Sequence, residues 1–412
     1  MNHAHGWHRI QNDAVWRHTR IIFVGSLLVF LINIVLGFLN VVSLKATGGI
    51  PRWVIVTHLH SGTLGWLTLS AIGFTVWIFT GNREVSKTYE KRVKWLAWAA
   101  VIIGAGYVLS FAIIFYPPVN EFVLLTILGT GMMLVIWATA LLALTQLRKQ
   151  PVLRTVHLLV AGAFTVASFG AIMGVLLSLH YAFSLPFDVG SLPLPYETPS
   201  LNFHAGPMDI YAVVIGTALV EWLVDRDKVS GWSWHGALQA GFFTLAGLLA
   251  FIPVETVSDI ATVLGILIGS LIFLVRMGWR AVLTNPFRRD ESTWGFFAPI
   301  WVVVFVGGII ASIAGVVPQD AEWFGPVVLH AYFIGLLTNS LFGMLSGRTR
   351  DNRTSPEWIE LGTMWLINLG LLTFMATEFM MEEFYRSDGA IVMGFGVLLG
   401  VATIGYRLLG ES

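Results

Sequence analysis

Long runs of apolar residues alternate with short polar connections along the whole chain. A helix that crosses a bilayer needs about 20 mostly apolar residues, and twelve runs of this kind are present. They lie at 21–44, 53–80, 95–116, 119–145, 155–181, 203–224, 233–254, 257–275, 294–317, 324–346, 361–381 and 389–410. The pattern predicts an all-α polytopic membrane protein: a cytoplasmic tail at 1–20, then a single twelve-helix domain at 21–412, embedded in the lipid bilayer.

The composition supports this class. Hydrophobic residues make up 56% of the 412 residues and charged residues 12%, about half of the roughly 25% charged residues of a globular domain. Cysteine is absent, which excludes thiolate metal sites, so any metal must be bound by histidine, methionine or oxygen ligands. The net charge is zero, and nucleic-acid partners are not expected.

The basic residues predict the orientation. Of the 24 lysines and arginines, only Lys45, Arg52 and Arg386 fall in segments that are external when the N-terminus is inside. The positive-inside rule therefore predicts a multi-pass protein of the inner or plasma membrane with both termini cytoplasmic. One long external connection, 183–202, carries four prolines and is expected to be either a lid or a linker.

Histidines recur at a period of four helices. The second, sixth and tenth spans each place a histidine in their first turns, namely His60, His204 and His330. Their separations suit three copies of a four-helix unit, and a pseudo-threefold arrangement would bring the three helices together. His180 ends the fifth span on the same side, although an interfacial role is the stronger expectation for it.

The pair His58 and His60 gives geometric information. Two positions on an α-helix differ by about 200° of rotation, so the two rings point to opposite sides of the helix. One metal ion cannot readily take both, whereas two centres flanking the helix can. The apolar run that follows suits flat cofactors such as haems. Ionisable groups within a bilayer are costly and are functional candidates for that reason.

Two embedded acids are further candidates. Glu378 lies in the outer third of the eleventh span, where it is expected to be either a proton carrier or metal ligand or a hydrogen-bonded structural acid. Asp209 lies two turns into the sixth span and has the same alternatives. The N-terminal residues Met1, Asn2 and His3 could chelate copper, but a tag-like or disordered end is the simpler reading.

One segment resembles a known family. The stretch His58-Leu59-His60-Ser61-Gly62-Thr63-Leu64-Gly65-Trp66 is similar to the His-x-His-Ser-Gly-Ala-Leu-Gly-Trp signature of subunit I in C-type haem-copper oxidases. The family carries this motif on its tenth helix, and here it is on the second. The His-x-His pair, and the late segment from His330 to Arg348, also resemble the NnrS family, which is linked to nitric oxide stress.

The resemblance implies two b-type haems. His60 and His204 would be the axial pair of a low-spin haem, and His58 would bind a high-spin haem whose open face points toward His330. Electrons would come from a quinol or a cytochrome, nitric oxide or oxygen would bind at the second haem, and Glu378 and His330 would serve its reduction. Copper with His180 and His330 is a further implication, but the adjacent His-His pair of the oxidases is absent.

Alternatives remain open at this point. One is a complete cytochrome or quinol oxidase or nitric oxide reductase catalytic subunit. For the protein in either case, the resemblance implies small partner subunits or a homo-oligomeric assembly. The other is a secondary transporter whose histidines line a substrate path, which broken helices near the midplane would favour.

Overall fold

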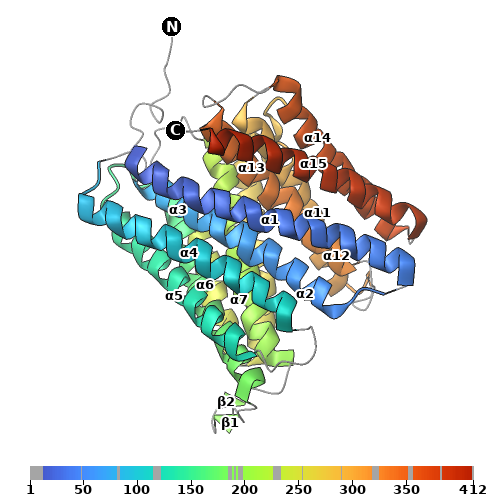
Figure 1. Cartoon of the computed structure of the whole chain (residues 1–412), viewed down its shortest axis with the longest axis horizontal. Helices are drawn as coiled ribbons and strands as arrows, with labels where there is room; N and C mark the ends of the chain where they lie inside the picture. Colours follow the sequence, from blue (N-terminus) through green and yellow to red (C-terminus); the bar gives the residue numbers. More distant parts are fainter. Residues whose placement is uncertain are drawn as a thin grey trace. The chain divides into compact units, whose positions relative to one another are not determined.

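The fold of the chain is almost entirely helical (Figure 1). The computed structural model describes residues 13–47, 49–80, 84–114, 122–183, 188–189, 192–193, 198–225, 233–252, 254–288, 290–317, 324–350, 356–380 and 383–410. The strands in these ranges are β1 (Asp188–Val189) and β2 (Leu192–Pro193), which pair antiparallel within the predicted external connection. The N-terminal residues 1–12, including the candidate copper ligand His3, lie outside the described residues.

The helices follow the predicted spans closely. The first seven α-helices in chain order are α1 (Asp13–Thr47), α2 (Arg52–His60), α3 (Leu69–Thr80), α4 (Lys87–Ile114), α5 (Phe122–Leu147), α6 (Thr155–Phe183) and α7 (Thr198–Asp225). The later ones are α8 (Trp234–Ala250), α9 (Glu255–Phe273), α10 (Trp279–Val282), α11 (Ala298–Ile313), α12 (Phe324–His330), α13 (Asn339–Thr349), α14 (Glu357–Phe379) and α15 (Glu383–Leu409).

Four short helical segments of other types interrupt or join these helices. Three are π-helices: η1 (Ser61–Thr68), η2 (Leu274–Gly278) and η4 (Ala331–Thr338). The fourth, η3 (Glu291–Gly295), is a 3-10 helix before α11. Because η1 and η4 continue directly from α2 and α12, each of these spans is one long helix with a widened middle. The sequence pattern did not predict this widening.

The protein is an all-α polytopic membrane protein. Eleven spans in the described part of the chain are long and apolar enough to cross a bilayer. At the predicted seventh span the structure has α8, which is 17 residues long, slightly shorter than the roughly 20 residues of a typical span. Large apolar side chains lie exposed along the helices, among them Val275 at 79%, Ile102 at 64% and Leu28 at 63%. Such side chains suit contact with lipid tails.

The chain forms two compact units. Unit 1 comprises Met1–Ser26, Leu64–Ala218 and Asp225–Ile272, and unit 2 comprises Leu27–Thr63, Leu219–Val224 and Phe273–Ser412. In unit 1, α5 lies beside α4 and α6, and α6 also contacts α8. In unit 2, α14 and α15 form a close antiparallel pair.

Glycines explain the close approach of α14 and α15. A Cβ atom on Gly370 would lie 2.3 Å from the backbone nitrogen of Met393, and one on Gly389 would lie 2.3 Å from that of Phe374. Both distances are too short for any side chain, so the two backbones touch at glycines, as small residues allow in membrane helix pairs.

The spans that carry His60, His204 and His330 are the most enclosed. In an apolar stretch of 18 residues in each of these spans, 83%, 83% and 78% of the residues are buried. The corresponding values in the other eight spans are 33–56%. Protein rather than lipid therefore surrounds most of each histidine-bearing helix. This enclosure is required for a buried site.

Candidate functional site

His58 is held by the neighbouring helix α1. Its Nδ1–H donates to the backbone oxygen of Asn33 at 3.0 Å. The Asn33 side chain in turn donates from Nδ2 to the backbone oxygen of His58 and to Oγ of Ser61, the latter at 3.0 Å. Asn33 therefore fixes both the ring and the backbone of His58.

Two glycines make room for this contact. A Cβ atom on Gly37, one turn after Asn33 on α1, would lie 3.2 Å from Cε1 of His58. A Cβ atom on Gly62 would lie 3.1 Å from Nδ2 of Asn33. Both positions are tighter than ordinary side-chain contacts, so a larger residue at either would press on the histidine or on its asparagine partner.

His60 and His330 share a second arrangement. Nδ1 of His60 lies 2.8 Å from the backbone oxygen of Val56, and Nδ1 of His330 lies 2.8 Å from that of Pro326. In each case the acceptor is four residues earlier in the same helix. Both rings are therefore anchored to the turn that precedes them.

His204 belongs to unit 1 and is anchored by α6. Its Nδ1 lies 2.8 Å from the backbone oxygen of Gly170. A Cβ atom on Gly174, one turn further along α6, would lie 2.8 Å from Cε1 of His204. The ring thus lies against a glycine face of α6.

His58, His60, His204 and His330 all have the same tautomer. A carbonyl oxygen can only accept a hydrogen bond, so Nδ1 carries the proton in each ring and Nε2 carries the lone pair. Metal-ligating histidines commonly have this second contact to a carbonyl, which fixes the tautomer and the orientation of the ring. Each imidazole is half-buried within its span.

His157 has the opposite arrangement. Its Nδ1 accepts from the backbone N–H of Arg154 at 3.0 Å, and its Nε2 donates to the backbone oxygen of Ile78 at 3.3 Å. Both ring nitrogens are therefore hydrogen-bonded to backbone groups, one just before α6 and one in α3, and the ring is buried. His157 is a structural histidine, whereas His235 is exposed and lies against Trp234.

His58 and His330 both belong to unit 2. The ring of His330 also packs against Phe374 of α14, with 5.0 Å between ring centroids. Glu378 follows Phe374 by one helical turn and is 3% exposed. Because residues four apart share a helix face, this buried acid lies on the side of α14 that meets His330.

The remaining candidates, His180 and Asp209, lie in unit 1. His180 lies half-buried near the end of α6 in unit 1, and Asp209 lies half-buried on α7 in the same unit. Among the described residues, no group of three or more histidine, aspartate or glutamate side chains is close enough to bind one metal ion directly.

The spans around His60 and His330 are two copies of one design. Each histidine is the last residue of an α-helix, and each is followed by an eight-residue π-helix and another α-helix. In the fourteen residues from each histidine onward, six are identical: His60/His330, Gly65/Gly335, Leu67/Leu337, Thr68/Thr338, Ser70/Ser340 and Gly73/Gly343. The sixth span has no π-helix in α7, so this likeness joins the second and tenth spans only.

A polar network supports the second copy. Asn339, the first residue of α13, donates to the side-chain oxygen of Asn368 at 3.0 Å and to the backbone oxygen of Gly335 at 2.8 Å. Trp301 donates from Nε1 to the same oxygen of Asn368 at 2.6 Å. All three side chains are buried, and the network fixes the end of η4 against α11 and α14.

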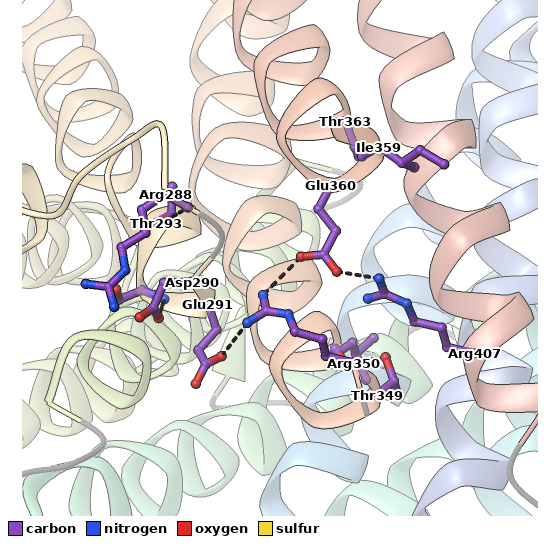
Figure 2. Close-up of polar contacts among 12 residues, drawn as sticks. Arg288, Asp290, Glu291, Thr293, Thr349, Arg350, Ile359, Glu360, Thr363 and Arg407 are labelled. Carbon is purple, nitrogen blue, oxygen red and sulfur yellow. Dashed lines mark hydrogen bonds and ion pairs between the residues drawn. The ribbon is translucent and has the colours of Figure 1, made fainter. Parts of the chain in front are cut away.

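Charged side chains form a layer at the other end of unit 2. Figure 2 shows Arg350 between Glu291 and Glu360, with N···O distances of 3.5 and 3.0 Å. Arg407, which is fully buried, pairs with the second oxygen of Glu360. We call these four residues the charged layer. It joins η3, α14 and α15 to the residue that follows α13.

Sequence reasoning missed Asn33, the π-helices and the charged layer. Asn33 carries a readable signal, because an asparagine in the middle of an apolar span is costly unless it is hydrogen-bonded. Its partner on another span could not be read from the sequence.

No family model matches the chain, and a search of curated proteins found no relative.

Proposed function

We propose that the protein is an integral membrane haem protein, related to subunit I of the haem-copper oxidases and to NnrS, which binds and reduces nitric oxide or oxygen. The observation that supports the proposal is that His58, His60, His204 and His330 share one tautomer, with the proton on Nδ1. Each lies in an enclosed span with Nδ1–H on a backbone carbonyl, so that Nε2 is the nitrogen with metal-binding character.

The surroundings of His58 fit a cofactor that carries both a metal and polar groups. Oγ1 of Thr57, the residue before His58, is buried in the described part of unit 2 without a hydrogen-bond partner. Buried polar atoms normally have a partner. A haem has two carboxylates that need donors, and the hydroxyl of Thr57 is a donor of the right kind.

The residues that would hold the haems are those expected from the sequence. His58 would bind one haem, with His330 on its open side, and the location of both residues in unit 2 supports this part. The pairing of His60 with His204 joins residues of different units and stays a prediction. A bound haem supplies an iron that exchanges electrons with a donor and offers an open position to a diatomic gas.

The protein itself contributes orientation, exclusion of water and a proton-holding group. Asn33 and Gly37 set the plane of the His58 ring, and the apolar side chains of the enclosing spans keep water out. The carboxyl group of Glu378, buried on the His330 side of α14, would hold a proton for reduction of the gas.

The remaining expectations belong to this proposal. A quinol or a cytochrome would donate the electrons, and the distribution of basic residues supports an inner or plasma membrane location with both termini cytoplasmic. Copper stays a prediction of the resemblance.

Haem quantification in single-histidine variants tests the proposal. The purified protein is expected to contain two haems per chain, and His58→Ala, His60→Ala and His204→Ala are each expected to lose one. His235→Ala is the matched control, since His235 is exposed, and should retain both. A haem content near zero in the unaltered protein would contradict the proposal and favour the transporter.

A further inference from the structure

A single asparagine on α1 makes most of the polar contacts of His58. Asn33 is 7% exposed and lies in a span whose apolar window has a mean hydropathy of 2.7. Burying an amide in such surroundings is costly unless its donors and acceptors are satisfied. Its partners are the backbone oxygen and the ring of His58 and the hydroxyl of Ser61.

The contacts of Asn33 constrain His58 in two independent ways. The side-chain donor reaches the backbone oxygen of His58, which also accepts from Oγ of Ser61 at 3.0 Å. The backbone oxygen of Asn33 accepts from the ring at 3.0 Å, and the side-chain nitrogen lies 3.2 Å from the same ring atom. The first contact fixes the end of α2, and the second fixes the ring and its tautomer.

The other histidines of unit 2 are held differently. His60 and His330 donate to a carbonyl of their own helix, a contact that any residue at the acceptor position would supply. The His58 ring instead donates to a carbonyl of another span, and the backbone oxygen of His58 accepts from a particular side chain, that of Asn33, with Gly37 beside the ring. A change on α1 therefore acts on His58 selectively.

We infer that Asn33 is the positioning residue of His58, and that α1 thereby sets the affinity and the midpoint potential of the haem that His58 binds. This inference rests on the proposed function. Outer-shell partners of ligating histidines typically change metal affinity by 10–100-fold when removed. The backbone carbonyl and the side-chain amide of Asn33 would be outer-shell partners of this kind, because both contact His58.

Two substitutions test the inference. Asn33→Leu keeps the approximate volume and removes the side-chain donor, and it is expected to weaken retention of the His58 haem about 10-fold. Asn33→Asp replaces the amide nitrogen near Nδ1 with a carboxylate oxygen. It also removes the donor to the backbone oxygen of His58, so retention is expected to weaken as in Asn33→Leu. The haem that is retained is expected to have a lower midpoint potential, because an anion beside Nδ1–H makes the imidazole a stronger electron donor to the iron.

Ser26→Ala is the matched control. Ser26 is a buried polar residue of the same helix, and its hydroxyl accepts from Ser70 rather than from a histidine. Haem titration and redox titration of the purified proteins are the measurements. The control should match the unaltered protein in both.

The outcomes separate this inference from the proposed function. If the unaltered protein binds no haem, the proposed function fails and this inference fails with it. If the unaltered protein binds two haems and both Asn33 variants keep the same affinity and potential, only the inference is overturned. A weaker affinity in Asn33→Leu or a lower potential in Asn33→Asp, with Ser26→Ala unchanged, supports it.

Discussion

His60 and His330 occupy equivalent positions 270 residues apart, each ending an α-helix that continues as an eight-residue π-helix. Both rings donate to the carbonyl four residues earlier, at the same distance of 2.8 Å. π-helices are rare and occur frequently at functional sites. Two of them in equivalent positions beside two histidines therefore support the choice of these spans as the candidate site.

The roles of His58 and His330 are expected to differ. Under the proposal His58 binds a haem and His330 faces its open side, so His330→Ala should keep both haems and change the carbon monoxide spectrum and rebinding rate. His58→Ala should lose one haem and the carbon monoxide signal with it. Equal haem loss in both variants would instead make His330 an axial ligand.

Gly174 is expected to be essential for the position of His204. A methyl group there would lie 2.8 Å from Cε1 of the ring, so Gly174→Ala must displace the imidazole and should reduce haem content or shift the absorption of the low-spin haem. Gly241→Ala is the control, because a Cβ atom on Gly241 meets nothing within 4 Å. If both variants had identical spectra, His204 would have no ligand role.

The charged layer is expected to contribute to stability. Glu360→Gln removes a buried carboxylate that faces both Arg350 and Arg407, which leaves the buried cation of Arg407 less compensated. Loss of one partner from a buried pair typically costs about 3–5 kcal/mol. Thermal unfolding in detergent should show a clearly lower midpoint for this variant and no change for Asp259→Asn, whose side chain is exposed. Equal midpoints would show that the pairs contribute nothing.

Asn368 is expected to stabilise the second π-helix. Asn368→Leu would leave the indole N–H of Trp301 and the amide of Asn339 without their shared acceptor. A buried polar group left without its partner costs about 1–3 kcal/mol, so the unfolding midpoint should fall. Thr373→Val on the same helix is the control, because that hydroxyl is exposed and bonds only within its own turn. A midpoint as high as that of the control would contradict the role of the network.

The spans were predictable from the sequence because they depend on local composition. Apolar runs of the required length coincide with eleven spans and with the shorter α8. The repeat of histidines was visible as well, because His60 and His330 lie in segments with shared residues. Whether three four-helix units surround a pseudo-threefold axis stays a prediction.

The contacts between spans were not predictable. Asn33 and His58 are 25 residues apart, and no local pattern indicates which helix faces which. The π-helices η1 and η4 also escaped prediction, since their segments lie inside the long apolar runs 53–80 and 324–346 without a break. The charged layer combines Glu291, Arg350, Glu360 and Arg407 from distant segments, each of which resembles a solvated helix end when it is considered alone.

An optical spectrum of the purified protein tests the central claim most directly. Reduced-minus-oxidised and reduced-plus-carbon-monoxide difference spectra should show two b-type haems, of which one binds carbon monoxide, and the carbon monoxide signal should be absent in His58→Ala. A colourless protein, or a haem signal that is unchanged in His58→Ala and in His204→Ala, would contradict the account.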